Sequence, residues 1–95
     1  MNNDDKDWTH PGPLGAWCQP DGYPDHHCVL GRECTIWLQP RPGWCDRGRY
    51  HATIDATGDL GRELDWADGW PRYYFDLGRA KAEIEAWLRK RGQLT

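Results

Sequence analysis

The sequence predicts an α+β fold, in which a small antiparallel sheet of three or four strands is covered by one C-terminal amphipathic helix and preceded by an irregular, Gly/Pro-rich segment. Two observations lead to this prediction. Two segments between positions 33 and 54 alternate polar and apolar side chains, which is typical of half-buried strands. Residues 77–91 repeat apolar side chains at the spacing of one helix face.

The chain is expected to form one domain behind a short leader. Ninety-five residues is the length of a single domain. Residues 1–13 are polar and acidic, so we expect them to be a flexible leader. Residues 14–32 hold several turn-forming glycines and prolines and show neither the helical nor the strand period. The predicted domain, 14–95, therefore comprises this loop region, a sheet over 33–75 and a helix over 77–91.

The sheet is expected to begin with a two-stranded hairpin. Pairing Ile36 with Tyr50 and Cys34 with Ala52 brings the apolar faces of the two alternating segments together. Trp37 then stands on the opposite, outward face, because successive side chains of a strand point to opposite sides.

Weaker patterns predict the remaining elements. Residues 62–66 lie between turn signals and are expected to form a short strand, and residues 72–75 a final strand that starts after Pro71. Asp76 is suited to cap the N-terminus of the helix, and Gly92 is suited to end it.

Composition and charge exclude some classes of function. The net charge is −3, and basic residues do not dominate the chain, so the footprint of a duplex-DNA-binding protein is absent. No apolar stretch reaches the roughly 18 residues that cross a bilayer, and the first residues do not form a secretory signal. We therefore expect a cytoplasmic protein that does not bind membranes, with cysteines that are reduced or metal-bound.

The cysteines and neighbouring histidines are candidate metal ligands. Thiolates and imidazoles are ligands that zinc prefers, and zinc would order a segment that has no core of its own. The cysteine spacings contain no C-x-x-C pair, so free thiols and disulfides remain alternatives to zinc. The candidate ligands are Cys18, Cys28, Cys34 and Cys45, with His26 and His27 as alternatives.

The outward face of the hairpin is the candidate binding surface. Tryptophan and arginine concentrate binding energy in protein interfaces, and the same residue types can stack on and neutralise single-stranded nucleic acid. In an alternative interpretation, Trp37 is covered by the N-terminal loops that contain Trp17. The candidate binding residues are Trp37, Arg41, Trp44, Arg47, Arg49 and His51.

A non-enzymatic binding protein is the leading functional hypothesis. The sequence contains no phosphate-binding, dinucleotide-binding or zinc-protease motif, and Cys28 beside His27 and Asp25 has no recognised catalytic signature around it. We expect a protein partner. By analogy only, from its small size and the absence of catalytic motifs, the chain is comparable to phage and mobile-element accessory proteins, including inhibitors of host defence such as anti-CRISPR proteins. The alternative hypothesis is a zinc-stabilised nucleic-acid-binding module.

Overall fold

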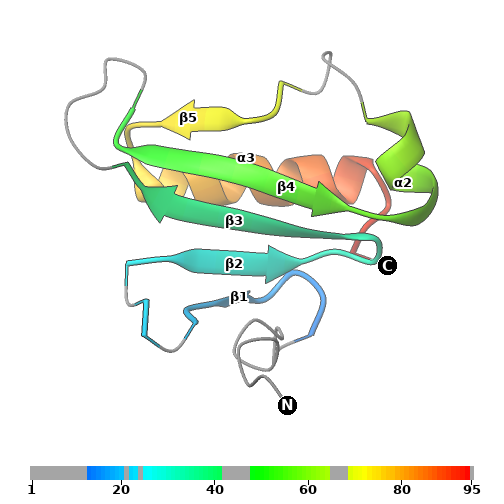
Figure 1. The fold of residues 1–95 in the computed structure, drawn as a ribbon, viewed down its shortest axis with the longest axis horizontal. Helices are drawn as coiled ribbons and strands as arrows, with labels where there is room; N and C mark the ends of the chain where they lie inside the picture. Colours follow the sequence, from blue (N-terminus) through cyan, green and yellow to red (C-terminus); the bar gives the residue numbers. More distant parts are fainter. Residues whose placement is uncertain (1–12, 21, 24, 42–47, 65–68, 95) are drawn as a thin grey trace.

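One antiparallel sheet and a helix packed on it form the fold (Figure 1). The computed structural model describes residues 13–20, 22–23, 25–41, 48–64 and 69–94, so most of the expected leader lies outside the described residues. Within them, five strands pair in chain order, each antiparallel to its neighbour. The elements are β1 (Trp17–Cys18), β2 (His27–Leu30), β3 (Cys34–Pro40), β4 (Tyr50–Ala56), α2 (Gly58–Glu63), β5 (Arg72–Tyr74) and α3 (Leu77–Lys90).

The α+β prediction is confirmed, but the sheet is larger than the expected three or four strands. The additional strands, β1 and β2, come from residues 14–32, which were expected to be loops. They have two and four residues, and Cys28 and Val29 are both buried although they are successive residues of β2. Strands this short, with burial on both sides, show no alternation that a sequence pattern can detect.

The predicted hairpin forms in a different register. Ile36 pairs with Ile54 and Cys34 with Ala56, so β4 is displaced by four residues from the predicted pairing. In this register all seven residues of β3 have partners. Because the displacement is an even number of residues, each side chain keeps its predicted face.

The prediction of a strand over 62–66 is wrong for the residues that the structure describes. Residues 58–63 form α2 instead, and Leu60 is buried in the core. The Glu33 carboxylate, at the turn between β2 and β3, accepts hydrogen bonds from the backbone N–H groups of Asp59 and Leu60. A carboxylate at this end satisfies N–H groups that have no partner within the helix.

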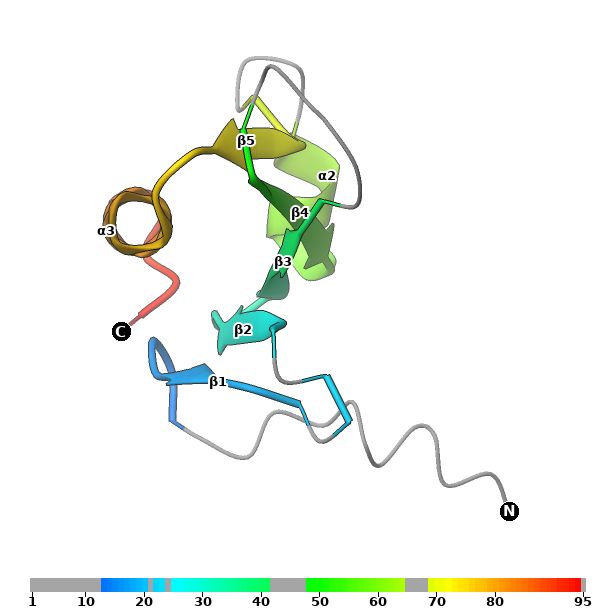
Figure 2. The ribbon, with the colours of Figure 1, turned by 90° about the vertical axis from the view of Figure 1, so that its left-hand side faces the viewer.

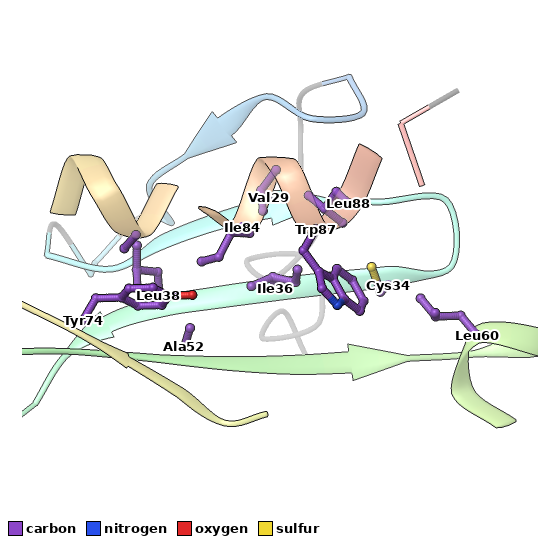
Figure 3. Close-up of a cluster of buried hydrophobic side chains, with 11 residues drawn as sticks. Val29, Cys34, Ile36, Leu38, Ala52, Leu60, Tyr74, Ile84, Trp87 and Leu88 are labelled. Carbon is purple, nitrogen blue, oxygen red and sulfur yellow. The ribbon is translucent and has the colours of Figure 1, made fainter. Parts of the chain in front are cut away.

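The C-terminal helix α3 is confirmed and covers one face of the sheet (Figure 2). The Asp76 side chain accepts a hydrogen bond from the backbone N–H of Arg79 at 2.8 Å, as expected of an N-cap. Among the described residues, no helix is both long and apolar enough to cross a membrane. Figure 3 shows the core between sheet and helix. Its members are Val29, Cys34, Ile36, Leu38, Ala52, Leu60, Tyr74, Ala80, Ile84, Trp87 and Leu88.

Candidate functional site

The strand register separates the sheet into two faces. The core residues Leu38 and Ala52 are partners on β3 and β4 and belong to the face that packs against α3. Gln39, His51 and Tyr73 are the next residues along β3, β4 and β5, and they form one row across the sheet. Since side chains alternate along a strand, this row points away from α3. We call the side of the sheet turned away from α3 the distal face.

A cleft of about 540 Å³ lies on the distal face. The row of partners on β3, β4 and β5 supplies part of its lining. The rest comes from the residue before β2, the last residue of β3 and the residue after it. The lining residues are His26, Gln39, Pro40, Arg41, His51 and Tyr73.

Tyr73 lies between an aromatic and a cationic neighbour. Its ring stacks on the His51 imidazole, with centroids 5.2 Å apart and planes inclined by 23°. The Arg41 guanidinium carbon lies 4.8 Å from the centroid of the Tyr73 ring, within the range of a cation–π interaction. One part of the cleft therefore combines flat aromatic surface with positive charge.

The histidines of the cleft supply polar groups. Burial, and secondarily the positive charge of Arg41, lowers the pKa of His51 from its ordinary value of 6.5. His51 is thus mainly neutral at pH 7, and a neutral imidazole has one hydrogen-bond donor and one acceptor. The Nδ1 atom of His26 is buried and has no hydrogen-bond partner among the described residues.

The structure brings part of the predicted binding set together. Arg41 and His51 line the cleft, and Arg49 is exposed immediately before β4. Trp37 lies two residues before Gln39 on β3, on the distal face, and is half-buried. The remaining two members, Trp44 and Arg47, lie outside the described residues.

Trp17 lies on the opposite side of the sheet from Trp37. Trp17 pairs with Val29 and belongs to the face that α3 covers. Its indole N–H donates to the Glu85 carboxylate on α3 at 3.0 Å, and the Lys81 ammonium lies 5.4 Å from its ring centroid. Strand β1 is therefore anchored by its pairing with β2 and by the contact of Trp17 with α3.

Tyr73 and Gln39 are cleft residues that sequence reasoning did not select. In a strand over 72–75, alternation puts Tyr73 and Tyr74 on opposite sides. The sequence pattern does not give the strand order. Tyr73 lies beside His51 only because β5 pairs with β4. His26 was considered only as a metal ligand.

The candidate metal ligands are divided between the two faces. Cys18 and Cys28 are partners on β1 and β2, next in the chain to the core-face pair Trp17 and Val29, and so lie on the distal face. Cys34 is in the core, where its thiol points to the Gln93 side-chain oxygen at 3.8 Å.

Within the described part of the chain, no three or more His, Cys, Asp or Glu side chains are grouped as a metal site. Cys45 lies outside that part, so the zinc site remains a prediction.

The histidine and cysteine considered for catalysis point in different directions. His27 pairs with the core residue Leu38, whereas Cys28 pairs with Trp37 on the distal face. Burial and then the nearby Lys81 lower the pKa of His27, while Asp25 opposes the shift.

Comparison with known proteins adds no relative. No model of a protein family matches the sequence, and no match was found among curated proteins or solved structures.

Proposed function

We propose that this protein is a non-enzymatic binding protein that holds a segment of a protein partner in the cleft of its distal face. The observation that supports this proposal most strongly is the contact of Tyr73 with both the His51 ring and the Arg41 guanidinium in the lining of that cleft. Tyrosine and arginine are enriched among the residues that dominate binding energy in protein interfaces.

The chemistry of the cleft favours a partner that presents a carboxylate beside an apolar side chain. A guanidinium that stacks on a ring through its flat face still directs N–H groups outward from its edge, and that edge fits a carboxylate. Arg49, which is exposed immediately before β4, adds a second positive charge. The flat side of the partner's apolar group would lie on the exposed part of the Tyr73 and His51 rings.

A pair of tyrosine and phenylalanine variants tests this proposal. The partner is first isolated from the source cells with the tagged wild-type protein, and its affinity is then measured by calorimetry. Tyr73→Ala should weaken binding by at least about 30-fold, equivalent to about 2 kcal/mol, because it removes the ring that contacts both His51 and Arg41 in the cleft. Phe75→Ala is the matched control, since Phe75 is 63% exposed and does not line the cleft.

The comparison of these variants has two decisive outcomes. Loss of affinity in Tyr73→Ala alone, with unchanged circular dichroism, supports the cleft as the binding site. Equal affinity of Tyr73→Ala and wild type, or a larger loss in Phe75→Ala, would show that the partner binds elsewhere.

Single-stranded nucleic acid is a second candidate ligand. The aromatic stack beside Arg41 favours it, because bases stack on aromatic side chains and arginines neutralise phosphates. Salt dependence separates the two candidates. Binding to nucleic acid should weaken steeply as salt rises and with Arg49→Ala, whereas a protein interface centred on Tyr73 and Trp37 should respond little to salt.

A further inference from the structure

Two cysteine side chains touch across the outermost pair of strands. Cys18 on β1 and Cys28 on β2 are direct partners in the antiparallel register. Their sulfur atoms are 3.3 Å apart, close enough for one thiol to donate a hydrogen bond to the other. Both are free cysteines.

We propose that Cys18 and Cys28 form a redox-active pair, which closes to a disulfide between β1 and β2 on reaction with a small-molecule disulfide such as oxidised glutathione. This site is separate from the proposed binding cleft, because neither cysteine lines the cleft.

The backbone geometry of the pair fits a disulfide. Residues directly opposite each other in an antiparallel pair have Cα atoms about 4.5–5.5 Å apart, and disulfides span Cα separations of about 4.4–6.8 Å. The sulfur atoms must approach by only about 1.3 Å to reach the bond length of about 2.05 Å. Small rotations about the side-chain bonds supply this movement without a change of strand register.

Exposure assigns different roles to the two sulfurs. Cys18 is half-buried, whereas Cys28 is only 2% exposed, so a glutathione molecule reaches Cys18 first. The Cys18 thiolate attacks one sulfur of oxidised glutathione, forming a mixed disulfide and releasing one glutathione thiolate. Cys28 then loses its proton to water or to that thiolate, attacks the Cys18 sulfur and releases the second glutathione. The two protein thiols thus lose two electrons and two protons, and one glutathione disulfide becomes two thiols.

The second step should be the slower one. Burial, followed by the hydrogen bond with Cys18, raises the pKa of Cys28 to about 12. In the mixed disulfide Cys18 no longer has a thiol, but burial, the larger cause, still raises the pKa of Cys28. Only the thiolate attacks a disulfide, so Cys28 reacts through a small deprotonated fraction at neutral pH. Closure should therefore accelerate as the pH rises.

Cys34 provides an internal comparison. It lies in the core, 5% exposed, near the Gln93 side chain, and burial raises its pKa to about 11. It is also on the other side of the sheet from Cys18 and Cys28. Cys34 should therefore remain a free thiol while the pair oxidises.

The positions of lysine and arginine in the chain allow the pair to be tested directly. Trypsin releases residues 7–32 as one peptide, which contains Cys18 and Cys28 and no other cysteine. The next cysteines follow in the peptide 33–47, because Arg41 precedes Pro42 and is not cleaved.

The folded protein is incubated with oxidised glutathione, quenched in acid, unfolded, alkylated with iodoacetamide and digested. We expect the peptide 7–32 to lose two hydrogen atoms and to carry no alkyl group. Retention of two alkylated thiols, a glutathione adduct on Cys18 that never closes, or a link to the peptide 33–47 would each overturn the proposal.

Variants and an unfolded control complete the experiment. Cys18→Ser and Cys28→Ala should each abolish the mass loss, and Cys34→Ser should leave it unchanged. In mixtures of reduced and oxidised glutathione, the disulfide of the folded chain should resist reduction at least about tenfold better than that of the synthetic peptide 7–32, because the fold holds the sulfurs together. Equal resistance to reduction in the folded chain and the peptide would mean that the fold does not favour the disulfide between Cys18 and Cys28.

Discussion

At the scale of single residues, the cleft depends on side chains that fix one another. Tyr73 is held between the His51 ring and the Arg41 guanidinium. Ordering these side chains before the partner arrives lowers the entropy lost on binding, because each rotamer is already restricted. The cationic charge of Arg41 also acts on His51, where it favours the neutral imidazole.

The lowered histidine pKa values predict how stability changes with pH. The native protein holds its protons on His51 and His27 more weakly than the unfolded chain, whose histidines titrate near 6.5. Between the native pKa values and 6.5, the unfolded state therefore binds more protons, and the free energy of unfolding falls as the pH is lowered. Urea unfolding at about pH 7.5 and about pH 5.5 measures this decrease.

His51→Gln tests the contribution of the cleft histidine to that decrease. The variant removes the titrating group, so its free energy of unfolding should fall less than that of the wild type over the same pH interval. Adding His27→Gln should reduce the pH-dependent decrease further. A decrease in His51→Gln as large as in the wild type would contradict the assigned protonation state.

The same residues show what a sequence can predict about a site. The alternation of residues 49–54 placed His51 on the outward side of a strand, and the structure agrees, because its side depends only on local strand geometry. The juxtaposition of His51 with Tyr73 depends on pairing between β4 and β5, whose paired residues are 20 to 24 positions apart. No periodic pattern contains that information.

At the scale of elements, the end of α3 is joined to the turn between β2 and β3 through a buried glutamine. Gln93 is 3% exposed, and its side-chain oxygen accepts a hydrogen bond from the backbone N–H of Glu33 at 2.7 Å. Its backbone carbonyl also accepts from the N–H of Arg32 at 2.9 Å. These bonds fix the position of the helix end relative to the sheet.

Gln93→Leu should destabilise the protein by about 1–3 kcal/mol, because it leaves the backbone N–H of Glu33 without its acceptor. Urea unfolding monitored by circular dichroism measures the change. Glu83→Gln is a suitable control, since it removes only the exposed ion pair with Arg79 and should cost no more than about 0.5 kcal/mol. If both variants lost the same stability, the bond to Glu33 would not be an important connection.

Elements with a long, regular pattern were the ones predicted well from sequence. The helix over 77–91 was found nearly to the residue, because its apolar stripe, its N-cap and its terminal glycine all agree. Strands β1 and β2 were missed because they are ordered by pairing with other strands and not by a pattern of their own. Strand β2 pairs with the long strand β3, and β1 pairs with β2. The predicted hairpin register was wrong because both registers bring the apolar faces together, so the apolar pattern does not distinguish them. The observed register is the one in which every residue of β3 has a partner on β4.

At the scale of the whole molecule, the two faces of the sheet are chemically different. One face is filled by apolar side chains beneath α3, and the other carries the cleft with Arg41, His51 and Tyr73. Helix α3 covers only one face of the sheet. Its packing therefore does not explain why polar and aromatic residues occupy the distal face. Binding of a partner is the explanation that we propose.

The most direct test of this proposal is a map of backbone amide chemical shifts, recorded on the isotope-labelled protein during titration with the isolated partner. We predict that the largest changes occur at Gln39, His51 and Tyr73, on the three strands that cross the cleft. The contrary result would be changes concentrated at exposed positions of α3, such as Arg79 and Glu83, with the cleft resonances unmoved.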